Sequence, residues 1–376
     1  MKIAILGMGT IGSGVYEYAK ARNDMTVVRT LDLKAWMDDM TTDIAEIVND
    51  PSIEIVVETM GGLHPAYEYA MKCLNAGKSY VTANKYLVSV YGLELQEAAK
   101  ANGVSFRFSA ACGGGIPYLK NLWDAGMSDN VIRVGGIMNG TTNYILDKMQ
   151  TEGVSYEDAL SEAQALGYAE RDPSSDVDGL DTQRKIALAS AVAFGALLKS
   201  DSIPTFGIRG IKKEDIAYFQ KKNLSIRLIA EAKKEGNAVC ACVQPTLVSS
   251  ASPENGIRKN INYLWYEGEK SGVFAFSGQG AGKYPTAANI IRDLLAIGAG
   301  EKSMLAENVR LENAVQNTER SFYVRAPLSE KDSLSALIRS METDGKWLYA
   351  VTVPMNEAEI HTMVRKMDGA FLAALA

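Results

Sequence analysis

The side chains best suited to chemistry are concentrated between residues 163 and 185, in AQALGYAERDPSSDVDGLDTQRK. Asp181 and Lys185 are four residues apart, so on a helix they lie on the same face. The apolar run IALASAVAFG follows, and a Lys entering apolar surroundings is suited to general acid–base work. By itself the pattern fits an active site and a solvated acidic loop equally well, because runs of charge usually lie in water. The carboxylates of this stretch are Glu170, Asp172, Asp176, Asp178 and Asp181.

The same stretch resembles the signature of homoserine dehydrogenases. The resemblance extends from residue 1 to about residue 318 and is poor beyond it. It implies reversible, NAD(P)-dependent hydride transfer between L-aspartate 4-semialdehyde and L-homoserine, a step of threonine, methionine and isoleucine biosynthesis. The positions in register with the signature are Ala163, Gly167, Tyr168, Asp172, Pro173, Asp176, Gly179, Asp181 and Lys185.

The resemblance also implies roles for individual residues. Lys185 and Lys85 match two catalytic lysines, of which Lys185 moves the proton and Lys85 lies between cofactor and substrate. Asp181 completes this catalytic set and, with Glu170, matches acids that suit the ammonium group of an amino acid. Lys85 also fits an ordinary surface lysine, and Asp176 fits a loop-capping acid as well as a direct contact. The remaining candidates for substrate contact are Asp176, Tyr168, Gly140 and Thr141.

The N-terminal residues MKIAILGMGTIGSGV indicate a strand, a glycine turn and a helix, which open a dinucleotide-binding unit. Glycines there permit a tight turn and a close backbone approach, and the helix start offers free N–H groups to a pyrophosphate. Two later segments, ETMGG and TANK, end predicted strands and therefore face the same cleft. The resulting candidates for cofactor contact are Gly7, Gly9, Thr10, Ile11, Gly12, Arg29, Thr59, Lys85 and Gly280.

Cofactor choice depends on residues 29–34, RTLDLK. Asp32 follows Gly12 by 20 residues, the usual distance for an acid on the ribose hydroxyls, which favours NAD. Arg29 and Lys34 are suited to a 2′-phosphate, which favours NADP. The balance leans slightly to NADP, with dual use expected.

A glycine run at residues 113–115 resembles the family's loop for a monovalent cation, in which backbone carbonyl oxygens bind sodium. Here Ser109 stands where the family usually has Glu, and Cys112 where it often has Val. Both changes bear on how well an ion is held. The carbonyl oxygens that remain available for Na⁺ are those of Ser109, Cys112, Gly114 and Ile116.

Composition narrows the class of protein. A net charge of −6 argues against nucleic acid or an anionic membrane as the main partner. The chain has no apolar run of about 18 residues, the length of a membrane-spanning helix. Its four Cys are too few and too scattered for a disulfide framework, which favours a cytoplasmic setting. The resemblance implies a homodimer or a larger homo-oligomer.

The order of the predicted elements indicates an α/β protein of three parts. Alternating strands and helices predict a Rossmann-type NAD(P)-binding domain over residues 1–125, completed by about 281–318. The resemblance implies that residues 126–280 form an α+β substrate and dimerisation domain. The tail, 319–376, supplies two convincing strands and two helices, and its segment PLSEKDS lacks a ligand-approach glycine. We therefore expect a shortened, degenerate ACT-like domain and little inhibition by threonine.

Two other functions compete with this interpretation. A semialdehyde dehydrogenase could use Cys112 as a thiol nucleophile, but that chemistry needs a base, usually His. The sequence has only His64 and His361, and neither has a matching context. A dinucleotide sensor without catalysis would keep the glycine turn, but it would not need the Asp181 and Lys185 pair.

Overall fold

The first part of this computed structural model is a parallel sheet of six strands in the order β3-β2-β1-β4-β5-β6. The structure describes residues 1–195, 197–301, 303–305, 313–314 and 318–376. All pairings in this sheet are parallel, so the carboxyl ends of its strands meet at one edge, where ligands bind in such folds. The strands are β1 (Lys2–Leu6), β2 (Thr26–Leu31), β3 (Met40–Thr41), β4 (Ile55–Glu58), β5 (Ser79–Thr82) and β6 (Phe106–Arg107).

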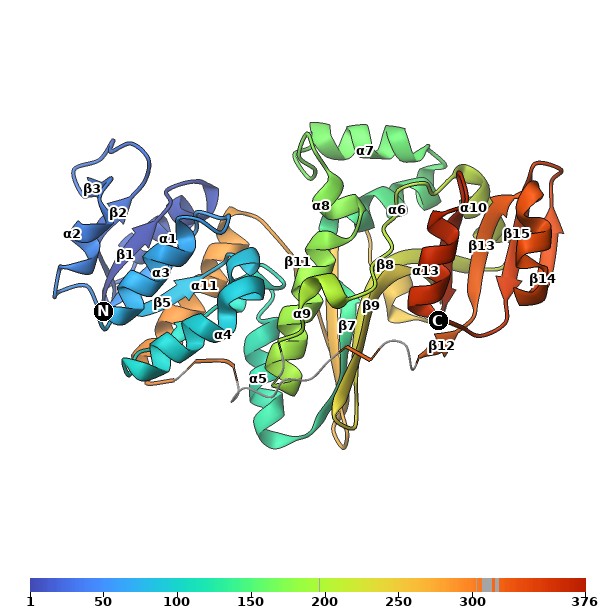
Figure 1. Ribbon diagram of the computed structural model, residues 1–376. Coiled ribbons are helices and arrows are strands. Elements are labelled where there is room, and N and C mark those ends of the chain that lie inside the picture. The colour runs from blue at the N-terminus through green and yellow to red at the C-terminus, as the bar shows by residue number, and fades with distance from the viewer. Residues whose placement is uncertain (196, 302, 306–312, 315–317) are drawn as a thin grey trace.

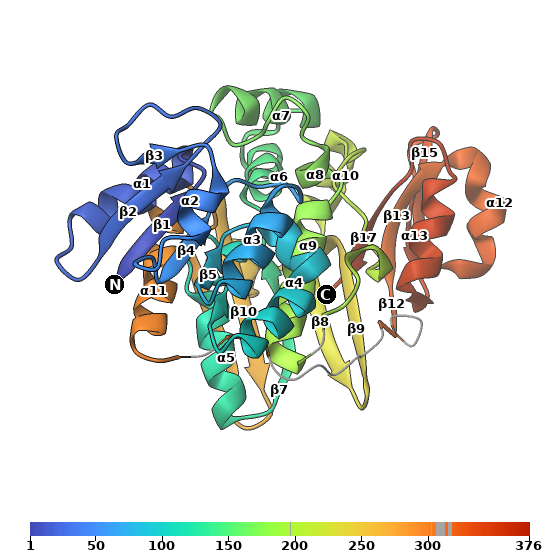
Figure 2. The same ribbon diagram turned by 60° about the vertical axis from the view of Figure 1, so that its left-hand side comes forward.

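A late helix completes this domain. Residues from α11 (Lys283–Gly298) share a buried apolar cluster with Ile3 and Ile5 of β1 and Val15 of α1. Figures 1 and 2 both place α11, in orange, among the blue N-terminal elements. Helix α11 therefore packs against α1 and the sheet of this domain. The other helices here are α1 (Thr10–Lys20), α2 (Ile44–Val48), α3 (Ala66–Asn75) and α4 (Lys85–Ala101).

The second part is built on a mixed sheet of nine strands in the order β11-β10-β7-β8-β9-β17-β13-β15-β14. Helix α9 (Leu180–Phe194) is almost wholly buried and packs on β7, β8 and β9 as well as on α4, so it lies between the two sheets. Although α9 is almost wholly buried, neither it nor any other helix in the described ranges is long and apolar enough to cross a membrane. The remaining elements are α5 (Tyr118–Ser128), β7 (Val131–Ile137), α6 (Gly140–Glu152), α7 (Tyr156–Ala165), α8 (Ser174–Val177), α10 (Lys213–Lys221), β8 (Leu224–Glu235), β9 (Ala238–Ser249), β10 (Ile261–Gly268) and β11 (Gly272–Gln279).

The tail is more complete than its sequence indicated. The expectation of only two convincing strands was wrong, because β14 and β17 add to β13 and β15. Strand β14 is largely exposed and β17 is a short apolar run at the chain end, so neither has the alternation typical of a half-buried strand. The tail elements are β12 (Glu319–Arg320), β13 (Phe322–Pro327), α12 (Lys331–Leu334), β14 (Ile338–Thr343), β15 (Trp347–Thr352), β16 (Met355–Asn356), α13 (Glu357–Arg365) and β17 (Phe371–Leu375).

The tail sheet continues the central sheet. Strand β17 lies parallel to β9, with Ala374 opposite Thr246 and Leu375 opposite Leu247. A buried ion pair adds to this junction, because Nε of Arg325 lies 2.8 Å from the carboxylate of Asp215 on α10. Figure 1 shows the three parts in a row, with the tail at the right in red and orange. The tail is therefore joined to the substrate domain and is remote from the N-terminal sheet.

Candidate active site

The start of α9 brings two lysines onto one carboxylate. Gly179 precedes the helix with a φ of 85°, which a side chain would strain, and Asp181 lies in the first turn, where an acid is favoured. Nζ of Lys185, one turn later, lies 2.6 Å from Oδ2 of Asp181. Nζ of Lys85, on α4, lies 3.0 Å from Oδ1 of the same carboxylate. Two segments nearly a hundred residues apart therefore meet at Asp181.

Two lysine side chains surround the ionised carboxylate of Asp181 in this cluster. Burial alone would raise the pKa of Asp181, but the ammonium groups of Lys185 and Lys85 outweigh it and hold the pKa well below its usual range. The nearby carboxylate of Asp181 in turn raises the pKa of Lys85. Asp181 is thus ionised, and two ammonium groups share its single negative charge. Such an arrangement suits a reaction in which negative charge develops on a substrate oxygen.

An asparagine that the sequence did not single out holds the acids in place. Asn139 caps α6, and its side-chain nitrogen donates to Oδ1 of Asp176 at 2.7 Å and to Oδ2 of Asp181 at 2.8 Å. Burial, and then the negative charge of Asp181, raise the pKa of Asp176. Nζ of Lys185 also donates to the carbonyl oxygen of Met138 at 2.7 Å. The segment before α6 therefore positions both the acids and the lysine.

Lys85 is positioned by a helix cap at the edge of the parallel sheet. It is the first residue of α4, and Asn84 before it accepts a hydrogen bond from the backbone N–H of Leu87. The Asn84 side chain also donates to the carbonyl of Gly62 at 2.6 Å. Buried Glu58 accepts from the hydroxyl of Thr82 at 2.6 Å, which ties together the ends of β4 and β5. These bonds give Lys85 a fixed base while its ammonium group reaches toward α9.

A cavity of about 320 Å³ opens beside Lys85. It brings together Ile11, Thr59 and Lys85, which the sequence predicted to contact a cofactor, and adds Arg184 from α9. The guanidinium of Arg184 lies over the ring of Tyr86, 4.7 Å from its centre. The cavity therefore extends from Ile11 on α1 of the first domain to α8 and α9 of the second.

The glycine turn is built for close backbone approach. Gly7 has a φ of 87°, and a Cβ on Gly12 would lie 1.9 Å from the carbonyl oxygen of Gly7. The hydroxyl of Thr59 donates to that same carbonyl at 2.7 Å. Gly9 caps α1 without a side chain, so the backbone N–H groups of Thr10 and its neighbours remain available for an anion. These are the features that a bound pyrophosphate requires.

Comparison with known proteins identifies this combination of site and fold. Sequence profiles described as homoserine dehydrogenase and as homoserine dehydrogenase, NAD binding domain, match residues 117–295 and 7–109. Homoserine dehydrogenase of Bacillus subtilis is 36% identical over 314 residues, which cover 79% of this chain and 72% of that protein. The Synechocystis enzyme is 37% identical over 349 residues, covering 88% and 80%. The chain belongs to the homoserine dehydrogenase family.

Solved homoserine dehydrogenases share this architecture. The crystal structure of the Thiobacillus denitrificans enzyme superposes with a TM-score of 0.89 at 29% identity, covering 100% of this chain and 98% of that one. A hyperthermophilic archaeal homoserine dehydrogenase in complex with NADPH superposes with a TM-score of 0.69 at 25% identity, covering 82% and 99%. The predicted fold class, the NAD(P)-dependent oxidoreductase activity and the family are thus confirmed.

Asp32, just after β2, adjoins the glycine turn in this family member. Its Oδ2 accepts from the backbone N–H of Met8 in the glycine turn at 2.8 Å, so the carboxylate lies at the end of β2 beside that turn. Arg29 lies three residues earlier, inside β2, with Nη1 3.7 Å from a carboxylate oxygen of Glu46. The acid, and not Arg29, is therefore the charged residue that adjoins the glycine turn.

Four predicted substrate contacts, Gly140, Thr141, Tyr168 and Glu170, differ in their depth and in their distance from the cluster. Thr141 is buried and its hydroxyl donates to the carbonyl of Tyr168 at 2.6 Å, which ties the signature loop to α6. Gly140 begins α6, where a Cβ would lie 2.7 Å from the carbonyl oxygen of Asn260. Glu170 is exposed, and its carboxylate makes no hydrogen bond or ion pair within the described ranges. Of these four residues, Glu170 is the one that the structure does not bring to the cluster.

The thiol-dependent alternative does not fit this homoserine dehydrogenase site. Cys112 is completely buried, and burial raises the pKa of its thiol to about 12. Buried His361 contacts Gln244 in the tail junction, and His64 pairs with Glu68 on the surface. A thiol that is neutral at physiological pH and has neither histidine beside it is a poor nucleophile.

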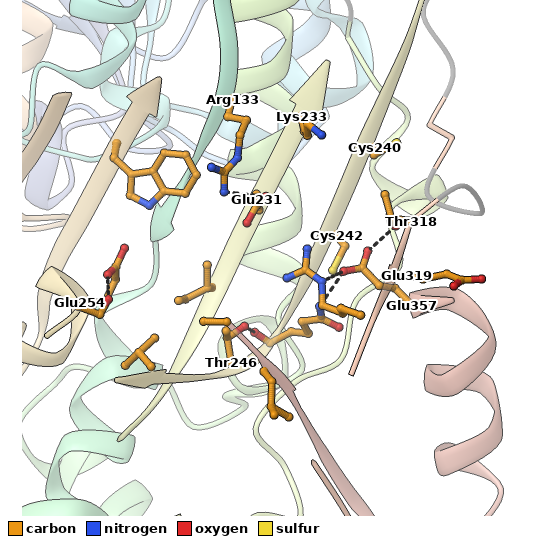
Figure 3. A pocket seen from close by; sticks show the side chains of 18 of the residues that line it. Arg133, Glu231, Lys233, Cys240, Cys242, Thr246, Glu254, Thr318, Glu319 and Glu357 are labelled. Carbon is orange, nitrogen blue, oxygen red and sulfur yellow. Dashed lines mark hydrogen bonds and ion pairs between the residues drawn. The ribbon is translucent and has the colours of Figure 1, made fainter. Parts of the chain in front are cut away.

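A larger hollow, of about 700 Å³, lies away from this site, between the central sheet and the tail. Figure 3 shows charged side chains along this hollow, and several of them are paired with one another. Arg133 contacts Glu231 at 3.1 Å, and Arg320 contacts Glu357 at 2.6 Å. None of the lysines or acids of the active-site cluster lines this hollow. Its size therefore does not make it the catalytic site.

Proposed function

We propose that this family member interconverts L-homoserine and L-aspartate 4-semialdehyde through the cluster of Lys185, Asp181 and Lys85. The observation that carries the proposal is the meeting of two ammonium groups on one buried carboxylate beside the cavity of the glycine turn. A dinucleotide sensor would have no use for a buried ion pair of Asp181 and Lys185, since burying charge is costly. The cluster therefore supports catalysis.

In this proposal Lys185 moves the proton and Lys85 stabilises the substrate oxygen. The nicotinamide, when bound, supplies or accepts the hydride. During reduction, Nζ of Lys185 gives a proton to the aldehyde oxygen as it becomes the homoserine hydroxyl, and during oxidation the proton returns. The second ammonium group, on Lys85, lowers the energy of the negative charge on that oxygen. Asp181 holds both ammonium groups in place, with one of its carboxylate oxygens in contact with each of them.

The amino-acid end of the substrate needs one anionic and one cationic partner. Asp176 and Glu170 are proposed for the ammonium group, with Glu170 closing over the site when substrate is bound, because its carboxylate is otherwise unengaged. Arg184, which lines the same cavity, is proposed for the carboxylate, since its planar guanidinium can bind it through two hydrogen bonds. Tyr168, Gly140 and Thr141 are proposed to shape the wall beside it.

We further propose a function for each of the three parts of the chain. Residues 1–125 with about 281–318 bind the cofactor, 126–280 bind substrate and form the homodimer, and 319–376 form the tail. Positions 302, 306–312 and 315–317 of the returning segment lie outside the described residues. The protein is proposed to be cytoplasmic. The absence of a glycine from the turn after β13 continues to support weak threonine inhibition, although the tail contributes four strands to the large sheet.

The sequence slightly favoured NADP, but the position of Asp32 supports NAD as the better of two usable cofactors. A carboxylate beside the glycine turn accepts hydrogen bonds from the ribose hydroxyls of NAD and repels the 2′-phosphate of NADP. Asp32→Asn is therefore expected to shift the NADP/NAD ratio of kcat/KM toward NADP by about 10- to 100-fold, the worth of one charge-assisted hydrogen bond.

Initial rates of homoserine oxidation with each cofactor, for the wild type and for Asp32→Asn, measure both the activity and the cofactor preference. Arg29→Ala is the matched control, and its ratio should stay near that of the wild type. If the wild type oxidises homoserine with neither cofactor, the proposed function is wrong. A ratio that changes only in Arg29→Ala would restore the preference for NADP.

A further inference from the structure

The loop between β6 and α5 is where family resemblance implies a monovalent cation. In this chain the side-chain amide of Asn289, on α11, enters that loop. Its nitrogen lies 3.2 Å from the carbonyl oxygen of Ser109, 2.8 Å from that of Gly114 and 3.1 Å from that of Ile116. These are three of the four oxygens expected to bind Na⁺. The side-chain nitrogen of Asn289 therefore already donates hydrogen bonds to these oxygens.

The neighbours of Asn289 determine which end of its amide faces the loop. Carbonyl oxygens only accept hydrogen bonds, so the NH₂ group must face them. The amide oxygen faces the other way, 3.5 Å from Nη1 of Arg292, which itself donates to the carbonyl of Gly115 at 3.1 Å. A reversed amide would aim an oxygen at three oxygens and an NH₂ group at a guanidinium. Only one orientation gives both ends suitable partners.

Charge around the loop is balanced without an ion. Ser109 is held by Asp293 of α11, whose carboxylate accepts from the Ser109 hydroxyl at 2.7 Å and from its backbone N–H at 2.8 Å. Nε of Arg107 lies 3.0 Å from the same carboxylate and compensates its charge. Asn289 and Asp293 are both almost completely buried. A cation placed here would therefore have no free anion beside it, because Arg107 already neutralises Asp293. Buried charge without a partner is costly.

We propose that the Asn289 amide replaces the monovalent cation, so that neither Na⁺ nor K⁺ is needed for folding or turnover. The implied Na⁺ site does not fit this chain, because a nitrogen 2.8–3.2 Å from three of its oxygens fills the space between them that an ion would need. Its two hydrogens lock the loop to α11, and Gly114 in turn packs so closely on Gly280 that a Cβ would lie 2.3 Å from that carbonyl oxygen. The inference rests on the fold alone, not on the roles of the catalytic residues.

The wild type provides the first test. Its melting temperature and its rate of homoserine oxidation are measured in sodium, potassium and tetramethylammonium chloride at one ionic strength, and crystals are soaked in Tl⁺. The expected result is the same melting temperature and rate in all three salts, with no anomalous peak in the loop. A saturable gain with Na⁺ or K⁺, or a Tl⁺ peak among the three carbonyl oxygens, would overturn the proposal whether or not homoserine is the substrate.

Variants at the same position provide the second test. Asn289→Asp keeps the shape but presents an oxygen in place of the NH₂ group, so it should create a cation site. Its melting temperature should rise by several degrees at saturating K⁺ or Na⁺. Ala288→Gly, at the preceding residue on α11, weakens the helix without adding an oxygen to the loop and should remain indifferent to cations. A folded Asn289→Asp protein that is equally indifferent would contradict the proposal, and if that variant does not fold, the wild-type Tl⁺ soak decides.

Discussion

Replacing Lys185 with methionine is expected to lower kcat for homoserine by about 10²–10⁴-fold, the usual contribution of a positioned proton donor. Methionine keeps much of the buried stem, and Asp181 keeps its contact with Lys85 at 3.0 Å, so the fold should persist. The dissociation constant of the cofactor, measured by fluorescence titration, should stay near its wild-type value because Lys185 does not border the glycine turn.

Lys148→Met is the matched control for this experiment. Lys148 forms a similar pair one helical turn apart, with its Nζ 2.9 Å from the carboxylate of Glu152, but it lies on α6 outside the cluster. Its loss should leave kcat almost unchanged. A Lys185→Met enzyme with near-normal kcat at saturating homoserine would show that another group transfers the proton.

Asp181→Asn is expected to damage both activity and stability. It leaves two ammonium groups around a neutral amide, and removal of one partner from a buried ion pair costs roughly 3–5 kcal/mol of unfolding free energy. The pKa of Lys85, raised chiefly by Asp181, should fall in the variant. The alkaline limb of the pH–rate profile should therefore shift to lower pH, and kcat should fall by about 10²-fold or more.

The free energy of unfolding that Asp181 contributes should decrease in acid. The folded pKa of Asp181 lies below its unfolded value, so its contribution is fully present above about pH 4 and is lost as pH falls further. Urea unfolding between pH 5 and 8 should thus show a constant deficit for Asp181→Asn. Asp147→Asn, which breaks a contact of 3.0 Å with Arg258 at another buried acid, controls for general loss of a carboxylate. Equal kcat profiles in the two variants would contradict the special role of Asp181.

The acid-rich signature and the glycine turn could be predicted from sequence because each is a local pattern. The four-residue spacing of Asp181 and Lys185 defines one helical face wherever the helix lies. The contact between Lys85 and Asp181 joins α4 to α9, and no local pattern encodes it. Helix α4 begins at Lys85 because Asn84 caps it. A capping asparagine before an apolar run was the available signal.

The residues that the sequence missed act through tertiary contacts. Asn139 looks like an ordinary cap for α6, and its second role, holding Asp176 and Asp181, arises only when α8 and α9 pack beside it. Asn289 is a polar residue in an apolar helix, which signals a buried partner without naming it. Strand β17 is recognisable only once it pairs with β9 and β13.

A crystal structure of the enzyme with NAD(P)⁺ and homoserine would test the central claim most directly. The account predicts the homoserine hydroxyl oxygen within hydrogen-bond distance of Nζ of Lys185, with Lys85 contacting the same oxygen from the cofactor side. The amino-acid end should face Asp176 and Arg184, with Glu170 moved inward. Homoserine bound with its hydroxyl turned away from both lysines, or bound in the hollow between the sheet and the tail, would contradict it.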